Sequence, residues 1–393
     1  MDFELNEAQR MLRASAGSVA KDFPPEYWRE KEEKVEHADE FWDACARAGF
    51  NGIIIPQDYG GSGLGMTELL LVMEALAQTS CGMAGVWYLV INEVFGGMSV
   101  LKHGTEEQKK RDLPGIASGE EHWCMCLTEP DAGSNTLNTK TTARREDNGW
   151  VINGDKTFIS EADIAEHTMI IVRTTPMEKA EKRTQGVSLI LGDLPDPHVD
   201  IAPIAKHAIN YSHSCTVGFN DYRVPLENMM VEDNGWYALL DTLNTERMSF
   251  TAAAIGIGRL AIRHAVEYSK TRRVFGDTPI GAYQALSFPL ALSYAQLECA
   301  ELLMYKAAKI YDDGGDYRAV GPAANMAKAA AVEAGTQATY WAMQTFGGYG
   351  YAKEYDIERW WREMQLIRLA PITQQMTLNY ITQYVIGMPR GYS

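Results

Sequence analysis

Three short stretches of the chain carry residue types that could hold a phosphate-bearing cofactor. The first is CLTEPDAGSN, residues 126–135, in which Pro130 fixes the backbone φ and Gly133 permits a turn that other residues disfavour. Ser134, Asn135 and the backbone N–H groups of such a turn can face phosphate oxygens. The same pattern suits an ordinary β-turn, so the motif alone leaves both interpretations open.

The second stretch is KTFIS, residues 156–160, a β-segment whose aromatic and hydroxyl side chains lie two positions apart. Regular alternation would put both on one face. The third is QTFGGYGY, residues 344–351, whose glycines resemble a dinucleotide-binding loop. They follow a helical pattern and not a strand, which favours a helix–helix turn.

A fourth stretch, RLAPITQQM, residues 368–376, offers a threonine and two glutamines as cofactor ligands. None of its side chains takes or gives a proton at neutral pH. If this protein moves protons, the acid or base comes from elsewhere in the chain.

These stretches lie in a chain that changes character twice. Helical periodicity dominates the first 120 residues, and short β-branched segments with alternation begin at about Trp123. Helical patterns return at about Asn234, with small residues that suit close helix packing. We predict an α-helical domain at 1–121, a β domain at 122–233 and an α-helical bundle at 234–393.

The composition narrows the functional classes. The 393 residues are 46% hydrophobic and carry a formal net charge of -16, without an offsetting basic run. Nucleic acid and anionic membranes are therefore unfavourable partners. The six cysteines show no metal-site spacing, and we predict no metal site. The N-terminus lacks a signal-peptide pattern and no apolar stretch reaches transmembrane length, so we expect a reduced, cytoplasmic protein.

Taken together, the motifs resemble those of the acyl-CoA dehydrogenase flavoprotein family over almost the whole length. CLTEPDAGS is similar to the family's TEPxAGS signature, TRRVFGDTPIGAYQA (residues 271–285) to its RxxFG…Q signature, and QTFGGYGY to its QxxGGxG signature. The resemblance implies an α+β fold with an N-terminal all-α domain, a middle β-barrel or sandwich domain and a C-terminal four-helix bundle.

The resemblance also implies FAD as cofactor. Phe158 stands where the family usually has a tryptophan, and Ser160 where it has a threonine bound to flavin N5; both keep an aromatic face and a hydroxyl donor. The positions that match FAD contacts are Met125, Leu127, Thr128, Gly133, Ser134, Phe158, Ser160, Arg272, Phe275, Gln284, Gln344, Gly347, Gly348, Thr373 and Gln375. Several match contacts to a neighbouring subunit's FAD, so we expect a homo-oligomer, commonly a tetramer in this family.

The implied reaction is α,β-dehydrogenation of an acyl-CoA, with electrons passed to an electron-transfer flavoprotein. Ser134, Asn244 and Arg247 match contacts to the thioester arm and CoA. A carboxylate removes the α proton in this chemistry. Many members place that glutamate two residues before the threonine matched by Thr373, where this chain has Pro371. Proline also lacks the backbone N–H that the family uses as a donor to the thioester carbonyl.

A second location for the base is known in isovaleryl-CoA-type members, at the start of the C-terminal domain. Glu246, in NTERMSF, matches it and is our predicted base. Glu93, in VINEVFGG, is the alternative, as base or as a polar contact to substrate. Two further functions stay open: an enoyl-CoA reductase of the crotonobetainyl-CoA type, and a catalytically silent homologue that binds FAD or CoA.

Overall fold

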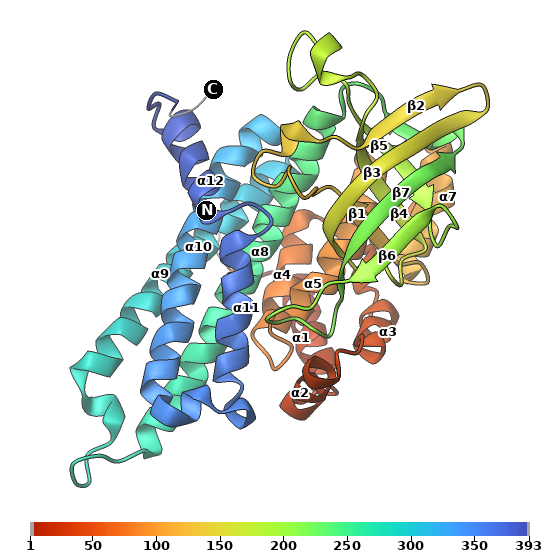
Figure 1. The fold of residues 1–393 in the computed structure, drawn as a ribbon. Coiled ribbons are helices and arrows are strands. Elements are labelled where there is room, and N and C mark those ends of the chain that lie inside the picture. The colour runs from red at the N-terminus through yellow and green to blue at the C-terminus, as the bar shows by residue number, and fades with distance from the viewer. Residues whose placement is uncertain (1–3, 391–393) are drawn as a thin grey trace.

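The computed structural model describes residues 4–390 and shows three packed parts (Figure 1). The chain begins with short amphipathic helices whose aromatic residues, such as Trp28 and Phe41, are buried against one another. These helices are α1 Glu7–Ala20, α2 Pro25–Lys34, α3 Asp39–Arg47, α4 Met66–Ala77, α5 Ala84–Leu89, α6 Ser99–His103 and α7 Glu106–Ser118. A π-helical segment, Val90–Met98, joins α5 to α6.

The middle part is one eight-stranded sheet, at the upper right of Figure 1. Its strands are β1 Trp123–Cys126, β2 Thr142–Glu146, β3 Gly149–Ser160, β4 His167–Arg173, β5 Val187–Asp193, β6 Val199–Pro203, β7 Ser214–Val224 and β8 Met229–Val231. Their order is β6-β7-β3-β2-β4-β5-β8, and β1 pairs in parallel with β4. β4 and β5 are buried almost throughout, which explains why their sequences read as apolar runs without alternation.

The C-terminal part consists of long helices, at the left of Figure 1. They are α8 Gly235–Thr271, α9 Gln284–Asp312, α10 Tyr317–Phe346, α11 Ile357–Leu369 and α12 Gln374–Tyr380. The small residues in α8 let its neighbours approach closely. A Cβ atom added at Gly258 would lie 2.9 Å from Leu297 Cδ1 in α9 and 3.2 Å from Gly335 Cα in α10.

The order of helical, β and helical parts confirms the predicted fold class. The last helical part is interrupted, because α11 stops before Pro371 and Thr373 begins a new helix as the N-cap of α12. One detail of the sequence interpretation was wrong, namely that no apolar stretch reaches transmembrane length. The helical stretch Ala84–His103 is long and apolar enough to cross a membrane, but 89% of its apolar window is buried inside the protein, as in a core helix.

Candidate active site and FAD surface

Glu246 lies in the interior, on the first half of α8. Its side chain is buried, and its Oε2 atom has no hydrogen-bond partner among residues 4–390. Burial raises the pKa of Glu246 to about 8, although the positive charges of Arg247 and Lys328 oppose the shift. A buried carboxyl group with an unpaired oxygen and a pKa near neutrality is suited to accept a proton.

Lys328 interacts both with Glu246 and with the segment at Pro371, which has no carboxylate. It lies on α10, is fully buried, and its Nζ donates to the carbonyl oxygen of Ile372 at 2.8 Å. Burial lowers the pKa of Lys328 to about 7, and Arg247 adds to that shift while Glu246 opposes it. The charges of Glu246 and Arg247 on α8 and of Lys328 on α10 therefore influence one another, and Lys328 also binds the turn beside Pro371.

Asn244 and Arg247, the predicted substrate contacts, are held in place by hydrogen bonds to each other and to α10. The Arg247 Nη1 donates to Asn244 Oδ1 at 2.5 Å, and Asn244 Nδ2 donates to the Tyr317 carbonyl oxygen at 3.0 Å. Arg247 Nε has no partner among the described residues although it is buried. This guanidinium keeps donor capacity for an acceptor that the chain itself does not supply.

Glu93 lies in the π-helical segment and is also fully buried. Its Oε1 accepts from the Ile54 N–H at 2.7 Å, whereas its Oε2 has no partner in the described part of the chain. Burial raises the pKa of Glu93 to about 8, against the backbone donors of Ile54 and Ile53. Unlike Glu246, it uses one oxygen to fix a loop of the N-terminal part.

Three of the residues predicted to hold the flavin, Met125, Leu127 and Thr128, lie where β1 ends. Thr157 N–H donates to the Thr128 carbonyl oxygen at 2.9 Å, which joins the first two motifs. Beneath them, Lys156 Nζ lies 2.9 Å from Glu129 Oε1 and also donates to the Leu127 carbonyl oxygen. Both charged side chains are almost completely buried, with 0% and 4% exposure. These contacts hold the turn after β1, with Leu127 and Thr128, against β3.

Phe158 and Ser160 sit on an irregular part of β3. The pairing of β3 with β7 shifts register between Lys156 and Ile159, and Phe158 has a φ of 57° with 64% of its surface exposed. The regular alternation expected from the sequence is therefore interrupted there. The bulge exposes the aromatic face of Phe158, and the turn residues Gly133 and Ser134 are exposed as well.

Thr373 and Gln375 lie at the start of α12. The Thr373 hydroxyl accepts from the Met376 N–H at 3.2 Å, so it caps the helix and keeps its own proton for another acceptor. Gln375 is exposed, while its neighbour Gln374 is buried and donates to the Ala329 carbonyl oxygen at 3.0 Å. Two hydrogen bonds, from Lys328 to the Ile372 carbonyl oxygen and from Gln374 to the Ala329 carbonyl oxygen, therefore hold this turn against α10.

The remaining predicted FAD contacts lie at the other end of the helical part. Tyr268 stacks on Phe346 with ring centroids 4.2 Å apart, which brings the ends of α8 and α10 together. The exposed residues at this end are Arg272, Phe275, Gln284, Gln344, Gly347 and Gly348. Since α8 has 37 residues, it is about 55 Å long, and one chain does not bring these residues to the β1 turn.

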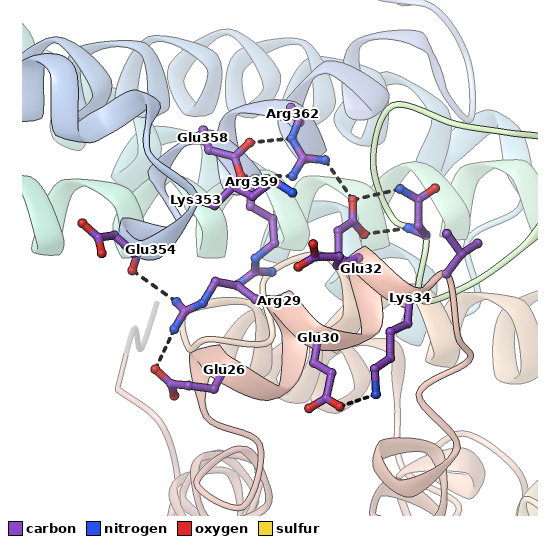
Figure 2. Close-up of a pocket in the computed structure, with 13 residues that line it drawn as sticks. Glu26, Arg29, Glu30, Glu32, Lys34, Lys353, Glu354, Glu358, Arg359 and Arg362 are labelled. Carbon is purple, nitrogen blue, oxygen red and sulfur yellow. Dashed lines mark hydrogen bonds and ion pairs between the residues drawn. The ribbon is translucent and has the colours of Figure 1, made fainter.

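A separate cavity of 740 Å³ lies between α2 and α11 (Figure 2). Several of its charged side chains are paired with each other: Arg362 bonds Glu358 and Glu32, and Lys34 bonds Glu30. None of the predicted site residues lines it. Its arginines are already neutralised by carboxylates, so this cavity has little attraction for the phosphates of FAD or CoA.

The comparison with protein families agrees with this arrangement. Models of the acyl-CoA dehydrogenase N-terminal, middle and C-terminal domains match residues 6–120, 124–222 and 233–385 in that order. The chain belongs to the acyl-CoA dehydrogenase family. Like its relatives, this family member is an oxidoreductase and an FAD-dependent flavoprotein.

Similar proteins differ in their named activities. Acyl-CoA dehydrogenase FadE12 of Mycobacterium tuberculosis is 39% identical, covering 98% of each chain. The subunit CarC of the caffeyl-CoA reductase-Etf complex of Acetobacterium woodii is 34% identical, over 94% of this chain and 96% of its own. Among solved structures, PigA with FAD and proline has a TM-score of 0.91 at 26% identity, covering 98% of this chain and 100% of its own.

Sequence reasoning missed two features of the site. Lys328 is the single lysine in an alanine-rich run, AANMAKAAAVEAG, and a lone lysine in such a helix was the available signal. Glu129 and Lys156 belong to two motifs 27 positions apart, and neither motif indicates that they pair. Burial and proximity, which only the fold supplies, turn these residues into parts of the site.

Proposed function

We propose that this protein desaturates an acyl-CoA thioester between Cα and Cβ, with Glu246 as the base that removes the α proton. FAD, when bound, supplies the hydride acceptor. Glu246 accepts the proton at a buried oxygen that has no partner in the described chain. Arg247 and Lys328 stabilise the carboxylate form, but burial outweighs them and raises the pKa to about 8, so the ionised base predominates only above that pH.

The observation that supports this assignment best is the contact between Lys328 and Ile372. The family's usual base would stand at position 371, and the neighbouring residue's carbonyl oxygen accepts from a lysine whose charge acts on Glu246. Glu246 on α8 therefore interacts with the same lysine as the turn at Pro371, which has no carboxylate of its own. Pro371 has no N–H, and we infer that the Ile372 N–H replaces it as a donor to the thioester carbonyl.

The acyl-CoA itself is expected along the side of α8 that carries Arg247. The Arg247 guanidinium, which Asn244 positions and whose Nε has no partner among the described residues, supplies a local positive charge in a strongly acidic protein. The exposed Ser134 would contact the thioester arm. We further propose that electrons leave to an electron-transfer flavoprotein, in line with the Etf complex named for the relative from Acetobacterium woodii.

The test is anaerobic bleaching of the flavin by straight, branched and cyclic acyl-CoAs. We expect wild type to bleach with at least one of them, Glu246→Gln to bleach about 10²–10⁴ times more slowly, and Glu93→Gln to stay close to wild type. The amide oxygen introduced by Glu93→Gln can still accept the Ile54 N–H, so this variant is a matched control for a buried glutamate. Full-rate bleaching in Glu246→Gln together with loss in Glu93→Gln would transfer the role to Glu93.

A second function, reduction of an enoyl-CoA, is favoured by one comparison. The relative with 34% identity is a subunit of a caffeyl-CoA reductase complex, and the same residues serve both directions of a reversible reaction. Reoxidation of dithionite-reduced protein by enoyl-CoAs, faster than bleaching by the matching acyl-CoAs, would identify a reductase. A purified protein that stays colourless after FAD addition would contradict both enzymatic functions.

A further inference from the structure

A cluster of imidazole and carboxylate groups joins the N-terminal helices to the sheet, away from Glu246. His37 lies between α2 and α3, Asp163 follows β3, and His213 precedes β7. His37 Nε2 is 3.1 Å and His213 Nδ1 is 2.6 Å from the same oxygen, Asp163 Oδ2. The ligand-type atoms of the three residues all lie within 4.8 Å of one another.

The outer nitrogen of His213 faces an acceptor, whereas that of His37 has no hydrogen-bond partner among residues 4–390. His213 Nε2 lies 3.0 Å from the Val35 carbonyl oxygen, which can only accept a hydrogen bond. His37 Nδ1 lies 3.9 Å from Glu161 Oε1. Both inner nitrogens converge on one Asp163 oxygen. With protons on the inner nitrogens these contacts are hydrogen bonds to Asp163, and with protons on the outer nitrogens the inner lone pairs and the carboxylate form a set of ligands for a cation.

Glu161 provides an independent observation. Its side chain is 0% exposed, and neither of its oxygens makes a hydrogen bond of standard geometry within residues 4–390. The nearby Lys206 ammonium is bound to the Ile209 and Ser212 carbonyl oxygens and to Ser214 Oγ. A buried carboxylate without partners, placed behind an imidazole, has the geometry of the carboxylate–histidine–metal arrangement in which the carboxylate orients the ligand.

We propose that His37 Nε2, His213 Nδ1 and Asp163 bind one divalent transition metal ion, with Zn²⁺ the best match. Tetrahedral zinc with ligands at 2.0–2.1 Å separates its ligand atoms by about 3.3 Å. The His37–Asp163 distance of 3.1 Å is close to that value, and the 2.6 Å contact opens by about 0.7 Å. Imidazole nitrogens select zinc over Mg²⁺ and Ca²⁺, and the charge of the ion balances Asp163 and Glu161.

The fourth ligand comes from water or from Cys215. The Cys215 Sγ lies 3.6 Å from Asp163 Oδ1, and Cys215 follows His213 closely in the chain. A site with these ligands would fix the α2–α3 connection to the end of the sheet that also carries Ser160. Its role is structural, and it is distinct from proton abstraction at Glu246.

The experiment measures metal binding to tag-free, FAD-loaded protein by calorimetry and by elemental analysis after dialysis. We expect one Zn²⁺ per chain, no binding of Mg²⁺, and a melting temperature that rises with Zn²⁺ concentration. His37→Gln and His213→Gln should abolish the stoichiometric binding. Glu161→Gln, which alters only the orienting partner, should weaken it by about 10–100-fold.

His167→Gln is the matched control, because His167 also lies beside two carboxylates, Asp193 and Glu121, but without a second histidine. This variant should bind zinc like wild type. Wild-type protein without bound zinc in the dialysed or titrated sample would overturn the proposal, whatever the variants do. Equal binding by wild type and by a folded, FAD-retaining His213→Gln variant would also overturn it.

Discussion

At the residue scale, the proposed function depends on the pH at which the buried Glu246 carboxylate is ionised. Burial raises the pKa of Glu246 to about 8, and a base must be deprotonated to act. We therefore expect kcat/KM to rise with pH and to level off above about 8, with a tenfold fall per unit on the acidic side. A profile that is flat down to about pH 6 would contradict the assignment.

Glu93 has a similarly raised pKa, so the profile alone does not separate the two glutamates. The same pH series on Glu93→Gln resolves this. If Glu246 is the base, kcat/KM of the Glu93→Gln variant still falls at acidic pH as in wild type. Only Glu246→Gln loses this pH dependence, together with most of its activity.

Lys328 gives a second prediction at this scale. Its positive charge lowers the pKa of Glu246, so Lys328→Met should raise that pKa and move the acidic limb to higher pH. Lys270→Met is the control, because Lys270 is exposed on the same helix as Glu246 and pairs with Glu267. An unchanged limb in a folded Lys328→Met protein would show that its role is confined to holding the Ile372 carbonyl group.

At the element scale, the junction of β1 and β3 determines whether the flavin surface exists. The buried Lys156–Glu129 pair joins two motifs, and removing one partner leaves an uncompensated buried charge. Such a change costs about 3–5 kcal/mol. We expect Glu129→Gln to lower the free energy of unfolding by about that amount and to reduce FAD retention.

Urea unfolding and the ratio of flavin to protein absorbance measure both effects. Asp131→Asn is the control in the same turn, since the Asp131–Lys140 pair is 71% and 67% exposed and contributes about 1 kcal/mol or less. Equal losses in the two variants would mean that the ion pair has no special part in building the turn.

At the scale of the whole molecule, the residues that match the family's FAD contacts lie in two separate regions of one chain. Phe275 is 97% exposed at a φ of 51°, in the loop between α8 and α9 at the lower left of Figure 1. An aromatic residue exposed in this way is poorly explained within one chain, and it matches a contact to the FAD of another subunit. We infer a homo-oligomer whose sites are shared, with a tetramer as the expected state.

The prediction is that Phe275→Ser weakens FAD binding more than about tenfold without lowering the stability of the folded chain, because it removes no contact within it. Met11→Ser, at a position 68% exposed on α1, should change neither property. Light scattering of the FAD-loaded protein should give a mass several times 43.7 kDa. A monomer that binds FAD as tightly as wild type after Phe275→Ser would contradict the shared site.

The sequence by itself determined the order of the three parts, the family and the cofactor, because apolar periodicity and short motifs are local properties. It also indicated Glu246, through the absence of a carboxylate at Pro371. The tertiary structure decided what depends on burial and long-range proximity. It set Lys328 against the Ile372 carbonyl group, where its charge acts on Glu246, paired Glu129 with Lys156, and gathered His37, Asp163 and His213 from three separate segments. Such contacts arise between residues far apart in the chain, and no local pattern specifies them.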